Sequence, residues 1–598
     1  MIQRSDSQNN FVPLNYQPIP HPRLLLLKGE EDAIIKASKE EVLKMKVNEA
    51  IINESNTILS KTPIERKLEG KRLLKQSREF LKRIFFLSFA YRVTLDNRYA
   101  ERAEKEMLAV AAFSDWGPSH YLDVAEMTTG MAIGYDWLYQ NLSLNSRNTI
   151  AASIITLGLT PSLDMAKSKS WLTGTYNWNQ VCNTGMTLGA LAIYESNPEM
   201  ANHIINRSIT AIKFPMSVYA PDGAYPEGYN YWGFGTTYNT LFLTTIEKAF
   251  GQDFGLSEAK GFLKSSQYML NMLGTKGESF NYSDAGAIER VVEPAMFWFQ
   301  NKTQDNSILY GQQKFLKNCK TSDLAKDRFL PALLIWAKDL KFSQITKPKS
   351  LIWVGQGQTP VALMRTSWDD PNALFVGFKG GSPISSHSHM DIGSFIFDYL
   401  GERWAMDLGN ENYGAIEAQG IDLFNNKQNS QRWQIFRHNN YHHNTLTVDS
   451  AFQNVNGYAS IISYNDAPDS LSASTDITSL YSPALDSAIR TIAIIDKEKV
   501  VVWDKIKNSN KLVQLKWTLV TPATVTIMDD HTIELSLHNK TLWMKLNYKG
   551  KAIPFTTPAT PFTSYEQKNK GVQLTGFDFE LTPNELAEWQ ITFSAKEK

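Results

Sequence analysis

Histidines gather in two segments of the C-terminal half of the chain. His387 and His389 lie two residues apart in SSHSHMDIGSFIFDYLGERWAMDLG, which also contains Asp407, and His443 lies in RHNNYHHNTLTVD. Alternate residues of a strand point to one face of a sheet, so this spacing predicts both histidines on the same face. Asp407 is expected to close a second strand and His443 to begin a third. Such imidazole and carboxylate groups together suit Zn²⁺, although histidines in this pattern are also often exposed or hydrogen-bonded without a metal.

Amide side chains cluster before a long apolar run in the N-terminal half. The segment TGTYNWNQVCNTGMTLGALAIYE contains Asn177, Trp178 and Asn179. Asparagine is common at helix N-caps and in turns, so a structural role is one interpretation of each amide. The other is that an uncharged donor stabilises negative charge that develops on a bound carboxylate.

Tyrosines crowd around one acidic residue further along the same half. Tyr229 and Tyr231 follow Glu227 in APDGAYPEGYNYWGFGTTY. Crowded tyrosines usually pack in a core, but a phenol can also transfer a proton. Because a free phenol has a pKa of about 10, it needs neighbouring positive charge before it abstracts a proton near neutral pH. His387 or Arg437 could supply that charge.

The elements that position these residues follow from the periodicity of apolar residues. From about residue 30 to about residue 340, apolar residues recur at three- and four-residue spacing, which predicts successive amphipathic helices. From about residue 350, short β-branched and aromatic runs separated by turns predict antiparallel sheets packed as a sandwich. We therefore expect a multidomain α + β protein with a helical domain over residues 1–345 and a β domain over residues 346–598.

Composition limits the functional class. The 598 residues contain 61 basic and 61 acidic side chains, a balance that argues against a general nucleic-acid binder and requires a local patch for any anionic ligand. The 15 Trp and 24 Tyr suit stacking on sugars as well as core packing. We expect no membrane span, because no run of eighteen apolar residues occurs. The first ten residues, MIQRSDSQNN, lack the apolar core of a signal peptide, as they would if a signal had been removed.

The histidine segments together resemble a known family. H-x-H-x-D-x-G-S-F, the following D-x-G and the later HNT-x-x-VD resemble the C-terminal signature of heparinase II/III-like polysaccharide lyases. The resemblance covers both halves of the chain in order. It implies an incomplete (α/α) toroid followed by antiparallel β-sheets. It also implies that His389, Asp407 and His443 bind a structural Zn²⁺, with Asp391 and His442 as alternative ligands.

The resemblance further implies β-elimination from a uronate sugar. Asn177 would neutralise the uronate carboxylate, with Asn179 second, and Tyr231, ahead of Tyr229, would be the catalytic tyrosine. His387 would face the substrate. Tyr231 would then act as both base and acid, or His387 would be the base and Tyr231 the acid. The expected substrate-binding residues are Trp178, Asn179, Glu227, Tyr229, Tyr413 and Arg437.

The substrate is expected to be an acidic polysaccharide or oligosaccharide, with a glycosaminoglycan first. Alginate or another uronate polymer comes second, because alginate-cleaving relatives tend to keep a histidine where this chain has Trp178. Two alternatives remain open. One is a glycoside hydrolase that uses paired carboxylates such as Asp222 and Glu227, and the other is a glycan-binding protein without activity. The substrate class implies a periplasmic or secreted protein whose signal peptide has been removed.

Overall fold

The computed structural model describes residues 11–13, 15–287 and 291–597. The first ten residues, on which the expectation about a signal peptide depends, lie outside this range. The chain forms two compact units, and each is built from several segments. The first unit comprises Met1–Ser217, Gly233–Leu263 and Val291–Thr346, and the second comprises Val218–Trp232, Lys264–Arg290 and Lys347–Lys598.

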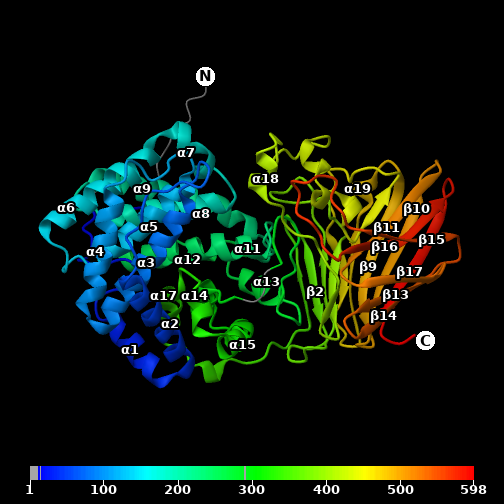
Figure 1. Ribbon diagram of the computed structural model, residues 1–598, viewed down its shortest axis with the longest axis horizontal. Coiled ribbons are helices and arrows are strands. Elements are labelled where there is room, and N and C mark those ends of the chain that lie inside the picture. Colours follow the sequence, from blue (N-terminus) through cyan, green and yellow to red (C-terminus); the bar gives the residue numbers. More distant parts are fainter. Residues whose placement is uncertain (1–10, 14, 288–290, 598) are drawn as a thin grey trace. The chain divides into compact units, whose positions relative to one another are not determined.

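The described part of the first unit is helical, as the blue to green ribbons in Figure 1 show. Its helices pack in a ring in which α3 contacts α5, α5 contacts α8, α8 contacts α12, α12 contacts α14, α14 contacts α17, and α17 contacts α3. Helices α2, α4 and α9 pack against members of this ring. The helices are α1 (Glu30–Glu40), α2 (Val42–Leu59), α3 (Leu74–Thr94), α4 (Asn97–Ala111), α5 (Tyr121–Trp137), α6 (Leu144–Ser153), α7 (Met165–Leu172), α8 (Asn177–Ala192), α9 (Pro198–Ala211), α10 (Lys213–Met216), α12 (Thr237–Phe250), α14 (Pro294–Thr303), α15 (Tyr310–Asn318), α16 (Thr321–Leu324) and α17 (Leu330–Trp336).

Local sequence explains how this ring is built. Every residue of α5 is buried, as expected for a helix that is largely apolar on all faces, and α3 and α8 pack against it on either side in the ring. Polar residues cap the outer helices: the side chain of Asp96 accepts a hydrogen bond from the backbone of Arg98 at the start of α4, and Asn197 caps α9 just before Pro198. Within the described residues, no single helix is long and apolar enough to cross a membrane, although the bent pair Leu144–Leu163 and Met165–Leu172 passes on length and composition alone.

The described part of the second unit contains antiparallel sheets with the strand orders β1-β2-β3-β4-β5, β12-β13-β14-β17-β10-β9-β8-β7 and β15-β16-β11-β6. One hydrophobic core takes side chains from all of them, including Phe397, Val502 and Trp517. The strands are β1 (Ile352–Gly355), β2 (Val361–Arg365), β3 (Phe375–Lys379), β4 (Phe395–Tyr399), β5 (Glu402–Ala405), β6 (Leu446–Val448), β7 (Ile461–Asn465), β8 (Ser470–Asp476), β9 (Leu485–Ile495), β10 (Lys499–Asn508), β11 (Val513–Thr521), β12 (Thr524–Asp529), β13 (Thr532–Leu537), β14 (Lys540–Asn547), β15 (Ala552–Pro558), β16 (Gln573–Leu581) and β17 (Leu586–Ser594). A helical region followed by an antiparallel β region confirms the predicted fold class.

Two segments from the N-terminal half belong to the second unit. The described residues of these segments, 218–232 and 264–287, contain the short α-helices α11 (Tyr229–Tyr231) and α13 (Ser265–Asn271) among longer loops. The carboxylate of Asp222 accepts the backbone N–H of Gln356 at 2.9–3.0 Å, just after β1. The Gly- and Pro-containing sequences of the two segments cannot continue the helical pattern, so these segments pack on the sheets instead. They carry Glu227 and Tyr231 into the same unit as the histidines.

Candidate active site

The HxH segment forms a turn and not a strand. His387 has a left-handed backbone, with φ of 57°, and β4 begins only at Phe395. The expectation of two histidines on one face of a strand was therefore wrong, because the Gly- and Pro-containing stretch that precedes them breaks the strand. Asp407 and His443 also lie in loops, after the end of β5 and before the start of β6.

The two histidines nevertheless converge on one buried carboxylate. Nδ1 of His387 lies 3.0 Å from Oδ2 of Asp284, and Nε2 of His389 lies 2.9 Å from Oδ1 of the same residue. Arg432 completes this group, with Nη2 3.3 Å from Oδ2 of Asp284. The sequence patterns did not identify Asp284 or Arg432. Asp284 comes from the 264–290 segment, far from the histidines in the chain, and follows no motif.

Two phenols meet the imidazole of His387. The ring of Tyr231 stacks on that of His387, with centroids 4.6 Å apart. The hydroxyl of Tyr413 lies 3.3 Å from the hydroxyl of Tyr231 and 3.1 Å from Nδ1 of His387. Phe424, which is 53% exposed, packs its ring edge-on to both His387 and Tyr413. We call Tyr231, His387, Tyr413 and Asp284 the catalytic cluster.

Burial and charge set the protonation of this cluster. Burial raises the pKa of Asp284, but the charge of Arg432 and the hydrogen bonds from the two histidines outweigh it and hold that pKa well below its usual range. Burial lowers the pKa of His387, whereas the hydrogen bond to Asp284 and the charge of Glu227 raise it, and the net shift is upward. Burial, reinforced by the charge of Asp284, raises the pKa of Tyr231. Tyr231 is therefore a neutral phenol that can donate a proton.

The amides belong to the first unit. Asn177 is the first residue of α8 and is buried, and the indole of Trp178 meets the ring of His120 edge to face at 4.8 Å. Asn179 is fully buried, and its amide nitrogen donates to the carbonyl oxygens of residues 172, 174 and 211 at 3.0–3.1 Å. Its amide donors are thus used to hold the loop before α8. The convergence of Asn177 with Tyr231 and His387 stays a prediction.

The remaining predicted residues of the second unit have different surroundings. Glu227 and Tyr229 are buried beside the catalytic cluster. Arg437 donates to the carbonyl oxygens of Leu408 and Asn410 at 2.8 Å, which fixes the loop after β5. The charge of Arg432, whose guanidinium contacts the carboxylate of Asp284, lowers the pKa of Tyr231. The predicted role of Arg437 toward Tyr231 stays a prediction.

Buried Asp and His side chains form two groupings that could hold a metal ion. One consists of Asp284, His389 and His438, and the other of Asp391, Asp407 and His443. The predicted ligands divide between these groupings, although the rings of His389 and His443 are only 5.4 Å apart.

The donor atoms of these groupings fit a cation. Nδ1 of His389 and both ring nitrogens of His438 are buried and have no hydrogen-bond partner among the described residues. Nε2 of His443 lies 2.9 Å from the carbonyl oxygen of Arg437, so its Nδ1 faces Oδ2 of Asp407 at 3.0 Å. A neutral imidazole that donates through Nε2 presents a lone pair to that carboxylate, and a cation between the two would satisfy both.

The two alternative ligands differ. The ring of His442 stacks on Phe436 with centroids 3.5 Å apart, its Nδ1 contacts the carbonyl oxygen of the same residue, and burial lowers its pKa to about 3. These contacts give His442 a structural role. Asp391 belongs to the second grouping and forms a buried ion pair with Lys379.

Comparison with known proteins agrees with this architecture. Residues 363–589 match the family model described as Heparinase II/III-like, C-terminal. The chain is similar to a solved structure of heparinase III, with 13% sequence identity, a TM-score of 0.59, and coverage of 86% of this chain and 76% of that chain. It is also similar to heparan sulfate lyase HepC from Pedobacter heparinus, with 13% identity, a TM-score of 0.53, and coverage of 96% of this chain and 92% of that chain. No curated protein matches the chain.

The fold is that of heparinase-type polysaccharide lyases, a helical region followed by an antiparallel β region. The match from residue 363 to residue 589 begins in β2, ends in β17 and includes His387, His389, Asp407 and His443. Residues 363–589 are thus similar to the C-terminal domain of heparinase II/III-like proteins, and the resemblance predicted from the histidine segments is confirmed.

Proposed function

We propose that this protein is a polysaccharide lyase that cleaves a uronate-containing glycan by β-elimination, with a glycosaminoglycan as the first candidate substrate. The observation that carries the proposal is the catalytic cluster: the phenol of Tyr231 stacks on the imidazole of His387, and the hydroxyl of Tyr413 contacts both. Elimination needs a base for the proton at C5 and an acid for the departing sugar oxygen. An imidazole and phenols within hydrogen-bond reach of one another supply both.

The roles follow from the protonation of these groups. Tyr231 is held as a neutral phenol by burial, so it is the acid that protonates the leaving oxygen. His387 lies against the same ring and is the proposed base. Because Asp284 and Glu227 raise its pKa, the neutral form that accepts the C5 proton gains population as the pH rises. The carboxylate of Asp284 orients this imidazole through its contact with Nδ1. Asn177 would donate its amide to the substrate carboxylate, where negative charge develops.

An acidic substrate requires a basic surface that the neutral overall charge does not provide. The first unit contains a groove of about 810 Å³ at the start of α3. Glu126 and Glu106 pair with Arg78 and Arg83, and the largely exposed Lys75 and Lys326 form ion pairs with Glu69 and Asp323. Glu69 and Glu79 also line the groove. Its basic side chains are Arg72, Lys75, Arg78, Lys82, Arg83, Lys326 and Arg328. The basic side chains of this groove support the proposal that the protein binds an anionic glycan.

The proposed metal is a structural Zn²⁺. Nitrogen and oxygen donors in a closed, buried set suit this ion, and His389, Asp407 and His443 are the proposed ligands. The orphaned Nδ1 of His389 and the Asp407–His443 contact support this choice. Zn²⁺ would hold the loops that carry His387 without taking part in proton transfer. Zinc measured by elemental analysis in the purified protein, and lost in His443→Ala, tests this part.

Hydrolysis is the weaker alternative. It needs two available carboxylates on either side of the scissile bond. Asp222 accepts the backbone N–H of Gln356 through both oxygens, and Glu227 is buried with Tyr225 3.5 Å away. These contacts assign Asp222 to holding β1, so Asp222 and Glu227 do not form an available pair.

A panel of uronate polysaccharides tests the proposal. Heparan sulfate, chondroitin sulfate, hyaluronan and alginate are each digested and followed by the ultraviolet absorbance of the new double bond. We expect one acidic glycan to give product with the parent, and losses of at least about 100-fold in Tyr231→Phe and His387→Ala. Tyr464→Phe, on the exposed strand β7, is a matched control that keeps full activity. Full activity in both cluster variants would refute the assignment.

Localisation to the periplasm or outside the cell is part of the same proposal, because long acidic glycans are extracellular. Cell fractionation of the native host with an antibody against the protein tests it. Retention in the cytoplasm would contradict it.

A further inference from the structure

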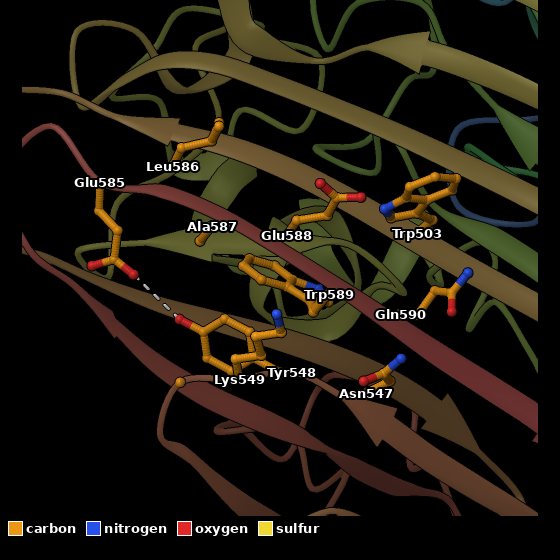
Figure 2. Close-up of a pocket in the computed structure, with 11 residues that line it drawn as sticks. Trp503, Asn547, Tyr548, Lys549, Glu585, Leu586, Ala587, Glu588, Trp589 and Gln590 are labelled. Atoms are coloured by element: carbon orange, nitrogen blue, oxygen red, sulfur yellow. Dashed lines mark hydrogen bonds between the residues drawn. The ribbon is translucent and has the colours of Figure 1, made fainter.

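The outer face of the eight-stranded sheet presents an exposed tryptophan away from the catalytic cluster. Along β10, Val502 and Asp504 are buried while Trp503 points outward and is 42% exposed. A single exposed aromatic residue is common on protein surfaces. Trp503, however, lines a pocket of about 580 Å³, and none of the residues of the catalytic cluster lines this pocket. Figure 2 shows the side chains around it.

The pocket arises where one strand leaves the sheet. β14 pairs with β17 only as far as Asn547, opposite Gln590, whereas β17 runs on to Leu586 with β10 as its partner. After Asn547 the chain turns away through residues 548–550 toward β15. Within the described residues, the stretch 586–589 of β17 therefore pairs with no strand on this edge. The loop of residues 548–550 forms a wall of the pocket.

The groups that line this pocket suit a sugar. Asn547, Gln590 and Trp503 lie side by side in one row across three strands, so two amides adjoin the indole on the same face. An indole offers a flat apolar surface for the C–H face of a pyranose ring, and amides hydrogen-bond its hydroxyl groups. The open edge of β17 spans residues 586–589, which is shorter than the roughly five or six residues most common in strands.

Charges around the pocket bear on the kind of sugar. Lys549, Glu585 and Glu588 line the pocket, and Lys505 is the next outward residue of β10 after Trp503. Glu588 lies opposite Lys505 on β17, and Glu585 is held by Thr582, whose backbone N–H and hydroxyl both donate to it at 2.8 Å. Lys549 is thus placed to meet a carboxylate or sulfate on a sugar stacked against Trp503.

We propose that this pocket is a second, non-catalytic binding site for the acidic glycan, with Trp503 as its stacking platform. The identity of the ligand rests on the proposed function, since the same chain would be held here and cut elsewhere. A site of this kind raises the affinity for a polymer that is long enough to reach both sites. It does not affect a short oligosaccharide that occupies the catalytic cluster alone.

Binding of the full chain to the glycan panel tests this inference. The Tyr231→Phe background is used so that the polymer is not consumed, and affinity is compared with and without Trp503→Ala. We expect binding of the acidic polymer to weaken about tenfold, equivalent to ~1.4 kcal/mol, and Trp503→Phe to restore part of it. Tyr464→Ala, which removes another exposed ring of the same sheet, is the control and leaves affinity unchanged.

The outcomes separate this inference from the proposed function. Equal affinity with and without Trp503, or equally tight binding of a neutral glucan, would overturn the inference. If Trp503→Ala reduces turnover of a tetrasaccharide as much as that of the polymer, the pocket is not a separate site and the inference also fails. The absence of unsaturated product from every glycan would refute the lyase proposal alone, because binding is scored without cleavage.

Discussion

Asp284 connects the catalytic cluster to the buried histidines, and Asp284→Asn is the sharpest perturbation of that connection. The substitution keeps the shape of the side chain and removes its charge. His387 then loses the charged acceptor that contacts Nδ1 at 3.0 Å, and Arg432 loses an ion pair at 3.3 Å. Because Arg432 keeps the carbonyl oxygens of Leu423 and Ser388 as acceptors, we expect the free energy of unfolding to fall by roughly 3 kcal/mol, the lower end for a broken buried pair.

The loss of activity should exceed what this loss of stability explains. A misoriented imidazole removes general acid–base catalysis, so we expect kcat to fall by roughly 10²–10⁴-fold on the cleaved glycan, measured where the variant is fully folded. Urea unfolding followed by circular dichroism gives the stability, and zinc content is measured on the same samples.

A matched control lies in the core of the second unit. Asp504 is a buried aspartate that pairs with Arg490 at 2.7 Å and accepts from two tryptophans. Asp504→Asn should cost a similar free energy and leave kcat within about twofold, since it touches no residue of the catalytic cluster. If Asp284→Asn retained normal kcat while Asp504→Asn lost as much stability as expected, the orienting role of Asp284 would be refuted.

Three further predictions concern the same residues. Tyr413→Phe removes the hydroxyl that contacts both Tyr231 and His387, so kcat should fall about tenfold while stability changes by less than ~1.5 kcal/mol; unchanged kcat would contradict the shared contact. Removal of zinc with a chelator should lower the thermal unfolding midpoint, because the buried ligands lose their metal, and the addition of zinc should restore the midpoint. A midpoint that does not move would exclude a structural metal. Asn179→Ala removes the amide that donates to three backbone carbonyls and should cost roughly 2–3 kcal/mol in urea unfolding, whereas Asn456→Ala, at an exposed turn, should cost almost nothing.

The fold was largely predictable because its signals are periodic. The three- and four-residue spacing identified the helical part, and short β-branched and aromatic runs separated by turns, such as that of β10, identified the sheets. The placement of residues 218–232 and 264–290 with the sheets was not predictable. Those segments have no period of their own, and tertiary contacts such as Asn281 with the backbone of Asp407 determine where they pack.

The candidate site was predictable only where a motif marks it. Tyr231, His387 and Tyr413 were named from the resemblance, and the structure places them together. Asp284 has no motif, and it joins His387 through a fold that brings together residues 103 positions apart. Arg432 and Arg437 are five residues apart on consecutive short turns, η8 (Gln431–Gln434) and η9 (Phe436–His438), and sequence spacing could not decide which one faces the carboxylate.

The central claim, that the chain breaks its glycan by elimination and not by hydrolysis, is tested most directly by mass spectrometry of the products formed in heavy-oxygen water. The account predicts fragments that carry no heavy oxygen in the newly formed ends and weigh one water less, per cleavage, than hydrolysis products. Incorporation of one heavy oxygen per cleaved bond would contradict it.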